Sequence, residues 1–182
     1  AIDEDLKKGD LPFLVVGTAG SVSTGAVDPL PELSAVCKEY GLWFHVDGAY
    51  GGFAAALPEE LGCPPDLKGL SLADSVAIDP HKWLYAPLEA GCVLVRDREV
   101  LHDTFSFHPP YYYMQEHEEE PELNYHEYGP QNSRGFRALK VWLALRQVGR
   151  EGYVRLMADD IALTREMFEL VSREAELEAV TG

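Results

Sequence analysis

The sequence predicts an α/β fold built on a parallel sheet. Apolar runs of strand length occupy residues 13–16, 42–46, 75–78 and 92–95, and a segment with helical periodicity separates the first run from the second. Continuous apolar strands that alternate with helices are typical of parallel sheets in which both faces are covered. Ligands of such sheets bind beyond the carboxyl ends of the strands. We therefore expect the functional residues to follow the apolar runs.

Two helices are expected in the first quarter of the chain. Residues 2–9 have the character of a helix end that Gly9 closes. Asp28 is expected to cap a second helix, which has Pro29 at its first position and stops at Gly41. The apolar residues of this second helix fall on one face, as expected for packing against a sheet: Leu30, Leu33, Val36, Cys37 and Tyr40.

The second half of the chain changes in character. Residues 102–131 contain three consecutive tyrosines and an acidic stretch at 116–122, which predicts a long exposed loop. A loop of this length in a compact domain is usually functional or disordered. Helical periodicity returns over residues 133–148 and 153–173.

Composition excludes several classes of function. The net charge of −16 argues against nucleic acid and anionic membranes as partners, because both require a basic surface. Cys37, Cys63 and Cys92 are far apart, which predicts reduced thiols and a cytoplasmic location. The uncharged run 11–27 is too rich in Gly, Ser and Thr for a membrane helix. The histidine spacings match no zinc pattern, so no metal is expected.

Two reactive groups stand where predicted strands end. Asp47 follows the run 42–46, and the pair His81-Lys82 follows Asp79 and the run 75–78. A pyridoxal phosphate enzyme needs a lysine amine that forms a Schiff base with the cofactor. It also needs a carboxylate that keeps the pyridine nitrogen protonated. The two groups in this order and context indicate a pyridoxal phosphate site.

Each candidate residue also has a plainer interpretation. Asp47 matches a helix cap or turn aspartate, Lys82 a surface lysine, His81 a hydrogen-bonded core histidine and Thr18 a turn threonine. The loop 17–20 fits no nucleotide-binding pattern. Small residues after Asp47 favour the cofactor interpretation because they leave room for a flat ring near the backbone: Gly48, Ala49, Gly51 and Gly52.

Together these motifs resemble the group II pyridoxal phosphate-dependent decarboxylases. This family includes the aromatic-L-amino-acid, tyrosine, tryptophan, histidine and glutamate decarboxylases. The His-Lys-Trp sequence and the Pro-Pro-Tyr sequence of the loop are closest to the aromatic branch. The resemblance covers nearly all of the chain and rests on the motifs at 16–21, 45–50, 73–75, 79–84 and 134–142.

The resemblance assigns the cofactor contacts residue by residue. It implies that Lys82 carries the Schiff base and that Asp47 pairs with the pyridinium nitrogen. It also implies that Ala49 lies under the ring and that Thr18 contacts the cofactor.

The resemblance also implies roles around the phosphate and in the loop. Asp79 and His81 would line the phosphate side, and Tyr111 matches the catalytic tyrosine of a mobile loop. That loop would reach into the active site of the other subunit of a homodimer. Asp79 stands where the animal aromatic enzymes have asparagine, so we expect any phosphate contact there to use the backbone. Tyr112 and Tyr113 are rivals of Tyr111 on local sequence.

The implied fold is that of the fold-type I pyridoxal phosphate-dependent transferases. Residues 1–145 would form the second half of the large domain, with the mobile catalytic loop at about 102–131. Residues 146–182 would begin a small α+β C-terminal domain. The family's N-terminal part, with its phosphate loop and ring-stacking histidine, is not in the sequence. We therefore expect this piece to be inactive alone.

The implied activity is decarboxylation of an aromatic L-amino acid to the amine and CO₂. The first alternative is a sibling enzyme on the same scaffold, either an aromatic aldehyde synthase or a glutamate, aspartate or histidine decarboxylase. The second alternative is a catalytically dead, dimer-forming paralogue. The sequence does not identify the substrate side chain, because much of that pocket comes from other segments.

Overall fold

The computed structural model describes residues 1–107, 109 and 123–180, and the chain divides into two compact units. The first unit contains Ala1–Leu94 and Arg137–Gly182, and the second contains Val95–Phe136. Within the described ranges, no helix is both long enough and apolar enough to cross a membrane.

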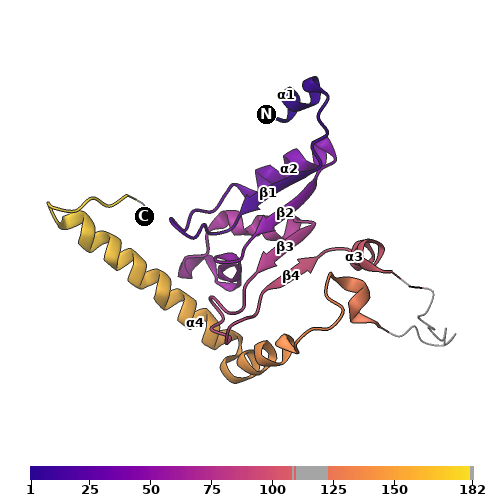
Figure 1. Cartoon of the computed structure of the whole chain (residues 1–182). Helices are drawn as coiled ribbons and strands as arrows, with labels where there is room; N and C mark the ends of the chain where they lie inside the picture. Colours follow the sequence, from indigo (N-terminus) through magenta and orange to yellow (C-terminus); the bar gives the residue numbers. More distant parts are fainter. Residues whose placement is uncertain (108, 110–122, 181–182) are drawn as a thin grey trace. The chain divides into compact units, whose positions relative to one another are not determined.

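The first unit is built on a four-stranded sheet in the order β1-β2-β3-β4 (Figure 1). The pairs β1–β2 and β2–β3 are both parallel, which confirms the predicted parallel α/β architecture. The strands are short and close to the apolar runs in the sequence: β1 (Leu14–Thr18), β2 (Trp43–Asp47), β3 (Ser75–Ile78) and β4 (Cys92–Val95).

One face of this sheet carries the core. Phe44 and Val46 of β2 are buried together with Leu30 and Cys37 of the helix α2 (Leu30–Tyr40). Alternate residues of a strand point to opposite faces. The neighbours of the core positions therefore lie on the other face, where Leu14 is 41% and Val16 is 52% exposed. The expectation of two covered faces is thus not met by the described part of the chain.

The start of α2 differs from the expectation. Asp28 does not cap the helix with its side chain. Its Oδ2 instead accepts a hydrogen bond from the backbone N–H of Thr18 at 2.8 Å, and its own N–H donates to the Thr18 carbonyl at 2.9 Å. The end of the helix is as predicted, because Gly41 has φ 66° and its N–H donates to the Cys37 carbonyl.

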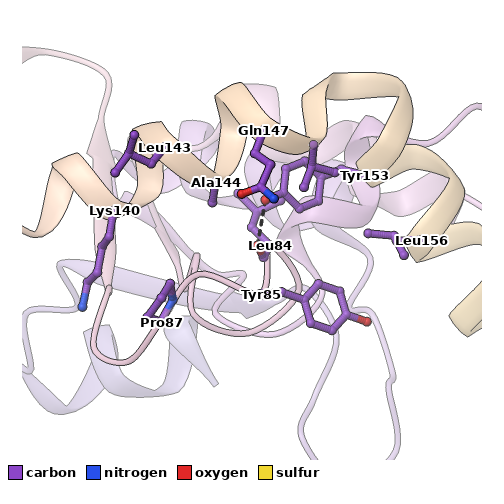
Figure 2. Close-up of a pocket in the computed structure, with 10 residues that line it drawn as sticks. Leu84, Tyr85, Pro87, Lys140, Leu143, Ala144, Gln147, Tyr153 and Leu156 are labelled. Atoms are coloured by element: carbon purple, nitrogen blue, oxygen red, sulfur yellow. Dashed lines mark hydrogen bonds between the residues drawn. The ribbon is translucent and has the colours of Figure 1, made fainter.

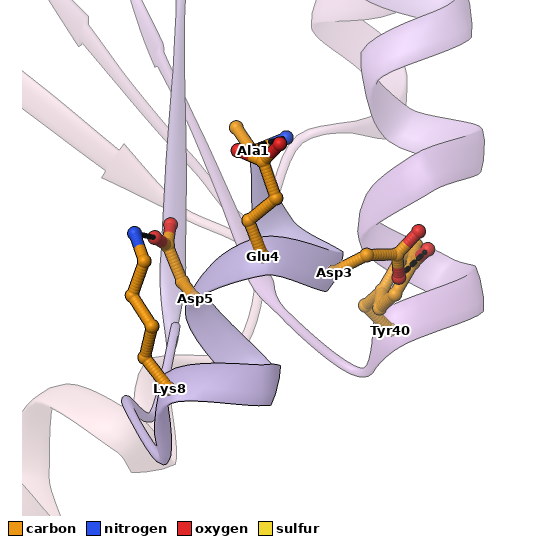
Figure 3. A network of polar contacts seen from close by, with 6 residues as sticks. All are labelled: Ala1, Asp3, Glu4, Asp5, Lys8 and Tyr40. Carbon is orange, nitrogen blue, oxygen red and sulfur yellow. Dashed lines mark hydrogen bonds and ion pairs between the residues drawn. The ribbon is translucent and has the colours of Figure 1, made fainter.

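The helix α1 (Ile2–Lys8) is attached to the end of α2 by a polar contact. The hydroxyl of Tyr40 donates to Oδ1 of Asp3 at 2.7 Å (Figure 3). Lys8 forms an ion pair with Asp5 at 3.3 Å on the exposed side of α1. Gly9 ends α1 in a left-handed conformation with φ 88°, as predicted.

Three short 3₁₀ helices connect β2 to β3, and none was expected from the sequence. The longest of them packs beside α2 on the core face and buries Leu67. They are η1 (Gly52–Ala56), η2 (Glu59–Leu61) and η3 (Pro65–Leu72).

The last helix of the unit, α4 (Arg137–Arg173), is interrupted at Gly149, where φ is 70° and ψ is 168°. The sequence predicted two helices separated by a break in this region. The second part of α4 buries Tyr153 and Met157 in the core.

The second unit holds two short helices, α3 (Arg98–Phe105) and η4 (Tyr125–Tyr128). Residues 102–105 and 125–128 of the long loop predicted at 102–131 are therefore helical. Asp97 caps α3 by accepting a hydrogen bond from the N–H of Glu99 at 3.0 Å. Tyr111 and the acidic stretch lie outside the described residues.

Candidate functional site

The predicted site residues gather at the carboxyl edge of the sheet. Thr18 is the last residue of β1 and pairs with Asp47, the last residue of β2. Asp47 in turn pairs with Ala77 of β3. Asp47 is exposed, and its Oδ1 accepts a hydrogen bond from the N–H of Ala49 at 3.1 Å. The sheet register therefore places a carboxylate and a hydroxyl on adjacent strand ends.

Glycines let the turns after β1 and β2 approach each other closely. Gly20 has φ 86°, a conformation that favours glycine. A Cβ atom on Gly51 would lie 2.6 Å from the Ala19 carbonyl oxygen, and one on Gly52 would lie 2.9 Å from Cγ2 of Ile78. The space beside Gly51 and Gly52 is therefore occupied by the protein itself. The expectation that these two glycines make room for a flat ring is wrong.

Lys82 lies in a tight turn that follows β3. Its backbone N–H donates to the Asp79 carbonyl at 2.9 Å, and the N–H of Tyr85 donates to the Lys82 carbonyl at 3.0 Å. The Nζ atom of Lys82 is 2.9 Å from Oδ2 of Asp79 and 6.0 Å from the centre of the Tyr50 ring. Tyr50 belongs to the turn after Asp47. The structure therefore brings the lysine turn beside the aspartate turn, although their motifs are separate in the sequence.

Asp79 and His81 occupy the same half-buried turn. His81 Nδ1 accepts a hydrogen bond from the N–H of Ala90 at 3.1 Å, so in the neutral ring the proton is on Nε2. This Nε2 atom lies 3.8 Å from Oδ2 of Asp79. The Asp79 carboxylate is thus directed toward Lys82 and His81, and its ion pair with Lys82 was not predicted.

Sequence reasoning missed three residues that support the site. Asp28 holds the backbone of Thr18 through two hydrogen bonds. Tyr153 and Asp160, both on α4, form hydrogen bonds to the residues that follow Lys82. Tyr153 donates to the Leu84 carbonyl, and Asp160 accepts from the side chains of Trp83 and Tyr85. Only Asp28 is close to a motif in the sequence, so only Asp28 could have been suspected from it.

A pocket lies beside the lysine turn. It has a volume of about 470 Å³, and residues of this turn and of α4 line it (Figure 2). None of the predicted site residues that the structure describes lines this pocket. Within the described residues, the edge that carries Asp47 and Lys82 is thus not part of this pocket.

Comparison with known proteins identifies relatives over the whole chain. Residues 1–181 match the family described as the pyridoxal-dependent decarboxylase conserved domain. An aromatic-L-amino-acid decarboxylase of Bacillus atrophaeus is 40% identical over 180 residues, which is 99% of this chain and 37% of that protein. A phenylacetaldehyde synthase of a rose hybrid is 38% identical over 148 residues, which is 81% of this chain and 28% of that protein. Further relatives include tyrosine and histidine decarboxylases.

Solved structures show the same similarity. The structure of Oryza sativa TDC with PLP and tryptamine superimposes with a TM-score of 0.88 at 29% identity. The match covers 99% of this chain and 36% of the rice chain. The chain thus spans about a third of the length of the relatives that it matches.

Proposed function

The chain belongs to the pyridoxal-dependent decarboxylase family, and from this premise we propose that the complete protein converts an aromatic L-amino acid into the amine and CO₂. The relatives that it matches include amino-acid decarboxylases and aldehyde synthases. The observation that carries the proposal is the register of the sheet. It puts Asp47 beside Thr18 on the edge where the Lys82 turn also lies.

The residues at this edge fit pyridoxal phosphate. Asp47 is exposed, and among the described residues its side chain accepts a hydrogen bond only from Ala49. One of its oxygens therefore remains for a ring nitrogen. Lys82 offers a primary amine in a turn whose backbone is fixed by hydrogen bonds. We assign Lys82 to the cofactor aldehyde and Asp47 to the ring nitrogen. Ala49 is assigned to a position under the ring, and Thr18 to a contact with the cofactor.

His81 and Asp79 are assigned to the phosphate side of the cofactor. The Nε2–H of His81 is a hydrogen-bond donor and suits an anion. The Asp79 carboxylate is an acceptor and does not, so its side chain serves Lys82 and only its backbone is left for the phosphate. This division of roles follows from the ion pair between Asp79 and Lys82.

When bound, pyridoxal phosphate supplies an electron sink for the substrate carbon that loses its carboxylate. The role of Asp47 is electrostatic, because a nearby negative charge favours the protonated form of a ring nitrogen. Tyr111 would return a proton to the substrate α-carbon, acting from the partner subunit of a homodimer. Support for that role comes from the sequence motif, since Tyr111 is outside the described residues.

A second candidate is aromatic aldehyde synthesis. It is favoured by the similarity to the rose phenylacetaldehyde synthase, which has an identity close to that of the bacterial decarboxylase. The two candidates share the release of CO₂ and differ in the organic product. A decarboxylase of another amino acid, such as histidine, would also release an amine, and it would differ from the first candidate only in its substrate.

The experiment is an assay of the complete protein with pyridoxal phosphate. CO₂ release is measured for each of the twenty amino acids, and the products are separated by chromatography. We expect CO₂ and amine from an aromatic amino acid. An aldehyde product would favour the second candidate. Release of CO₂ from histidine or glutamate alone would contradict the aromatic assignment, and no release from any amino acid would support a dead paralogue.

A further inference from the structure

We propose that Asp160, on α4, is a positioning residue that holds the turn carrying Lys82 in place for the cofactor. The inference rests on the proposed function, in which Lys82 is the cofactor lysine. Asp160 itself does not touch the predicted cofactor residues. It acts on the two aromatic residues that follow Lys82 in the chain.

Two hydrogen bonds converge on one oxygen of Asp160. The indole Nε1–H of Trp83 donates to Oδ2 at 2.9 Å, and the hydroxyl of Tyr85 donates to the same atom at 2.7 Å. Between them, the carbonyl of Leu84 accepts a hydrogen bond from the buried hydroxyl of Tyr153 at 2.9 Å (Figure 2). Three consecutive residues after Lys82 are therefore attached to α4.

The turn needs such attachment because of its backbone conformation. Tyr85 has φ 52°, in the left-handed region that residues other than glycine rarely adopt. Such a conformation persists where the surrounding structure fixes it. Asp160 holds the side chain of Tyr85 by its hydroxyl, and Tyr153 holds the Leu84 carbonyl, which belongs to the peptide group just before Tyr85. These two hydrogen bonds supply the restraint.

The influence of Asp160 reaches Lys82 through two neighbouring aromatic rings. The rings of Trp83 and Tyr50 lie 6.1 Å apart between centroids and are tilted by 42°. Lys82 Nζ lies 6.0 Å from the centre of the Tyr50 ring. Fixing the indole of Trp83 therefore fixes a neighbour of the tyrosine beside which the lysine lies. Since Tyr50 belongs to the turn after Asp47, α4 restrains both turns of the site.

A carboxylate suits this position better than an amide. Asp160 meets two donors at one oxygen, and an ionised carboxylate is an acceptor only. Hydrogen bonds to a charged acceptor are also stronger than those to a neutral one. An asparagine would keep the shape and one acceptor oxygen but lose the charge. We therefore expect a graded series in which Asp160→Asn lies between the native protein and Asp160→Ala.

The test uses the complete protein with three variants, Asp160→Ala, Asp160→Asn and the matched control Asp159→Ala. Asp159 is the adjacent residue on the same helix, and its side chain is exposed. The first readout is the rate at which cofactor-free protein captures pyridoxal phosphate in a form that borohydride traps. The others are kcat, KM and the thermal unfolding midpoint.

We expect Asp160→Ala to slow cofactor capture and to lower kcat by about tenfold to hundredfold, as for a misplaced reactive group. KM should change less than kcat, and Asp159→Ala should stay within about twofold of the native protein. If Asp160→Ala does not fold, Tyr85→Phe replaces it, because it removes only one of the two hydrogen bonds. A smaller slowing of capture is expected for that variant.

A double variant tests the route through Trp83. Coupled residues give effects that do not add. If Asp160 acts through the indole, adding Trp83→Phe to Asp160→Ala should lower the capture rate and kcat only slightly further. Fully additive losses would overturn this route.

Unchanged capture rate and kcat in folded Asp160→Ala would overturn the inference. So would a lower unfolding midpoint with normal capture per folded molecule, because that result indicates stability alone. Failure of the native protein to trap cofactor, or equal trapping in Lys82→Ala, would contradict the proposed function and this inference with it. The two failures are therefore distinguishable.

Discussion

Asp47, the last residue of β2, pairs in register with Thr18, the last residue of β1. This register fixes the carboxylate on the edge where ligands of parallel sheets bind. The position is exposed, so the Asp47 side chain is accessible to a ligand in the described part of the chain. We therefore expect the negative charge of Asp47 to act on the bound cofactor.

Asp47→Asn keeps the side-chain shape and removes this charge. We expect the barrier of the catalysed step to rise by about 3 kcal/mol, or roughly a hundredfold in kcat, as for the loss of one preorganised electrostatic group. The measurement is kcat of the complete protein at saturating pyridoxal phosphate. Asp159→Asn serves as a charge-matched control. A kcat within about twofold of the native value would reject the role of Asp47.

Gly51→Ala tests the close approach of the two turns. The new Cβ would lie 2.6 Å from a backbone oxygen of Ala19, which cannot move aside as a side chain can. We expect the free energy of unfolding to fall by about 1–3 kcal/mol, the usual cost of overpacking. Gly129→Ala is the control, because the nearest atom beyond the adjoining residues, Nη2 of Arg134, would be 3.6 Å from the new Cβ. Equal unfolding midpoints for the two variants would contradict the packing.

Alkaline titration tests the hydrogen bond between Tyr85 and Asp160. This hydrogen bond, then burial, then the Asp160 charge raise the pKa of the Tyr85 phenol above its ordinary value. A group with a raised pKa in the folded state stabilises the fold below its unfolded pKa, which is about 10 for tyrosine. That contribution is lost as pH rises through the higher folded value.

In Asp160→Ala, therefore, Tyr85 should ionise at lower pH. The measurement is the ultraviolet absorbance of tyrosinate, with Tyr85→Phe used to assign the signal. Asp3→Ala is the control, since it removes the hydrogen bond that raises the pKa of Tyr40 instead. An unchanged Tyr85 titration in Asp160→Ala would show that this hydrogen bond does not form in solution.

Mixed subunits test whether active sites are shared between two copies of the protein. Lys82→Ala lacks the proposed cofactor lysine, and Tyr111→Phe lacks the proposed proton donor. If Tyr111 acts in the partner's site, one site of each mixed dimer holds both native groups. We expect activity of about a quarter of the native level in a statistical mixture, because half of the dimers are mixed and each has one intact site of two. A verified mixed dimer without rescued activity would count against sharing.

The strand ends could be predicted from the sequence because their signals are local. Asp47 directly follows the run 42–46 and Thr18 lies two residues after the run 13–16, so both were expected on one edge, and the register confirms this. Gly9 and Gly41 were also predicted correctly, since a glycine at a helix end has few other interpretations.

The sequence did not predict the role of a residue whose local pattern fits two roles equally well. Asp28 precedes a proline and a helix, as a capping residue does, yet its carboxylate binds the Thr18 backbone. Gly51 follows a candidate cofactor residue, yet the space beside it is filled by Ala19. In both cases a tertiary contact, which no local pattern records, decides the role.

Contacts between segments that are distant in the chain could not be predicted from the sequence pattern. Asp160 lies 77 residues after Trp83, and nothing in the helical periodicity of α4 separates it from the exposed Asp159 beside it. The short helices between β2 and β3 were missed for a related reason. The longest of them, η3, packs against α2, and η1 packs against η3. Such tertiary contacts leave no strong periodic signal in the sequence.

The role of Lys82 is tested most directly by identifying the residue that binds the cofactor. The complete protein is incubated with pyridoxal phosphate, reduced with borohydride and digested, and the peptides are analysed by mass spectrometry. We predict one cofactor on Lys82 in the native protein and none trapped in Lys82→Ala. Cofactor attached to another lysine, or trapped equally in Lys82→Ala, would contradict this prediction.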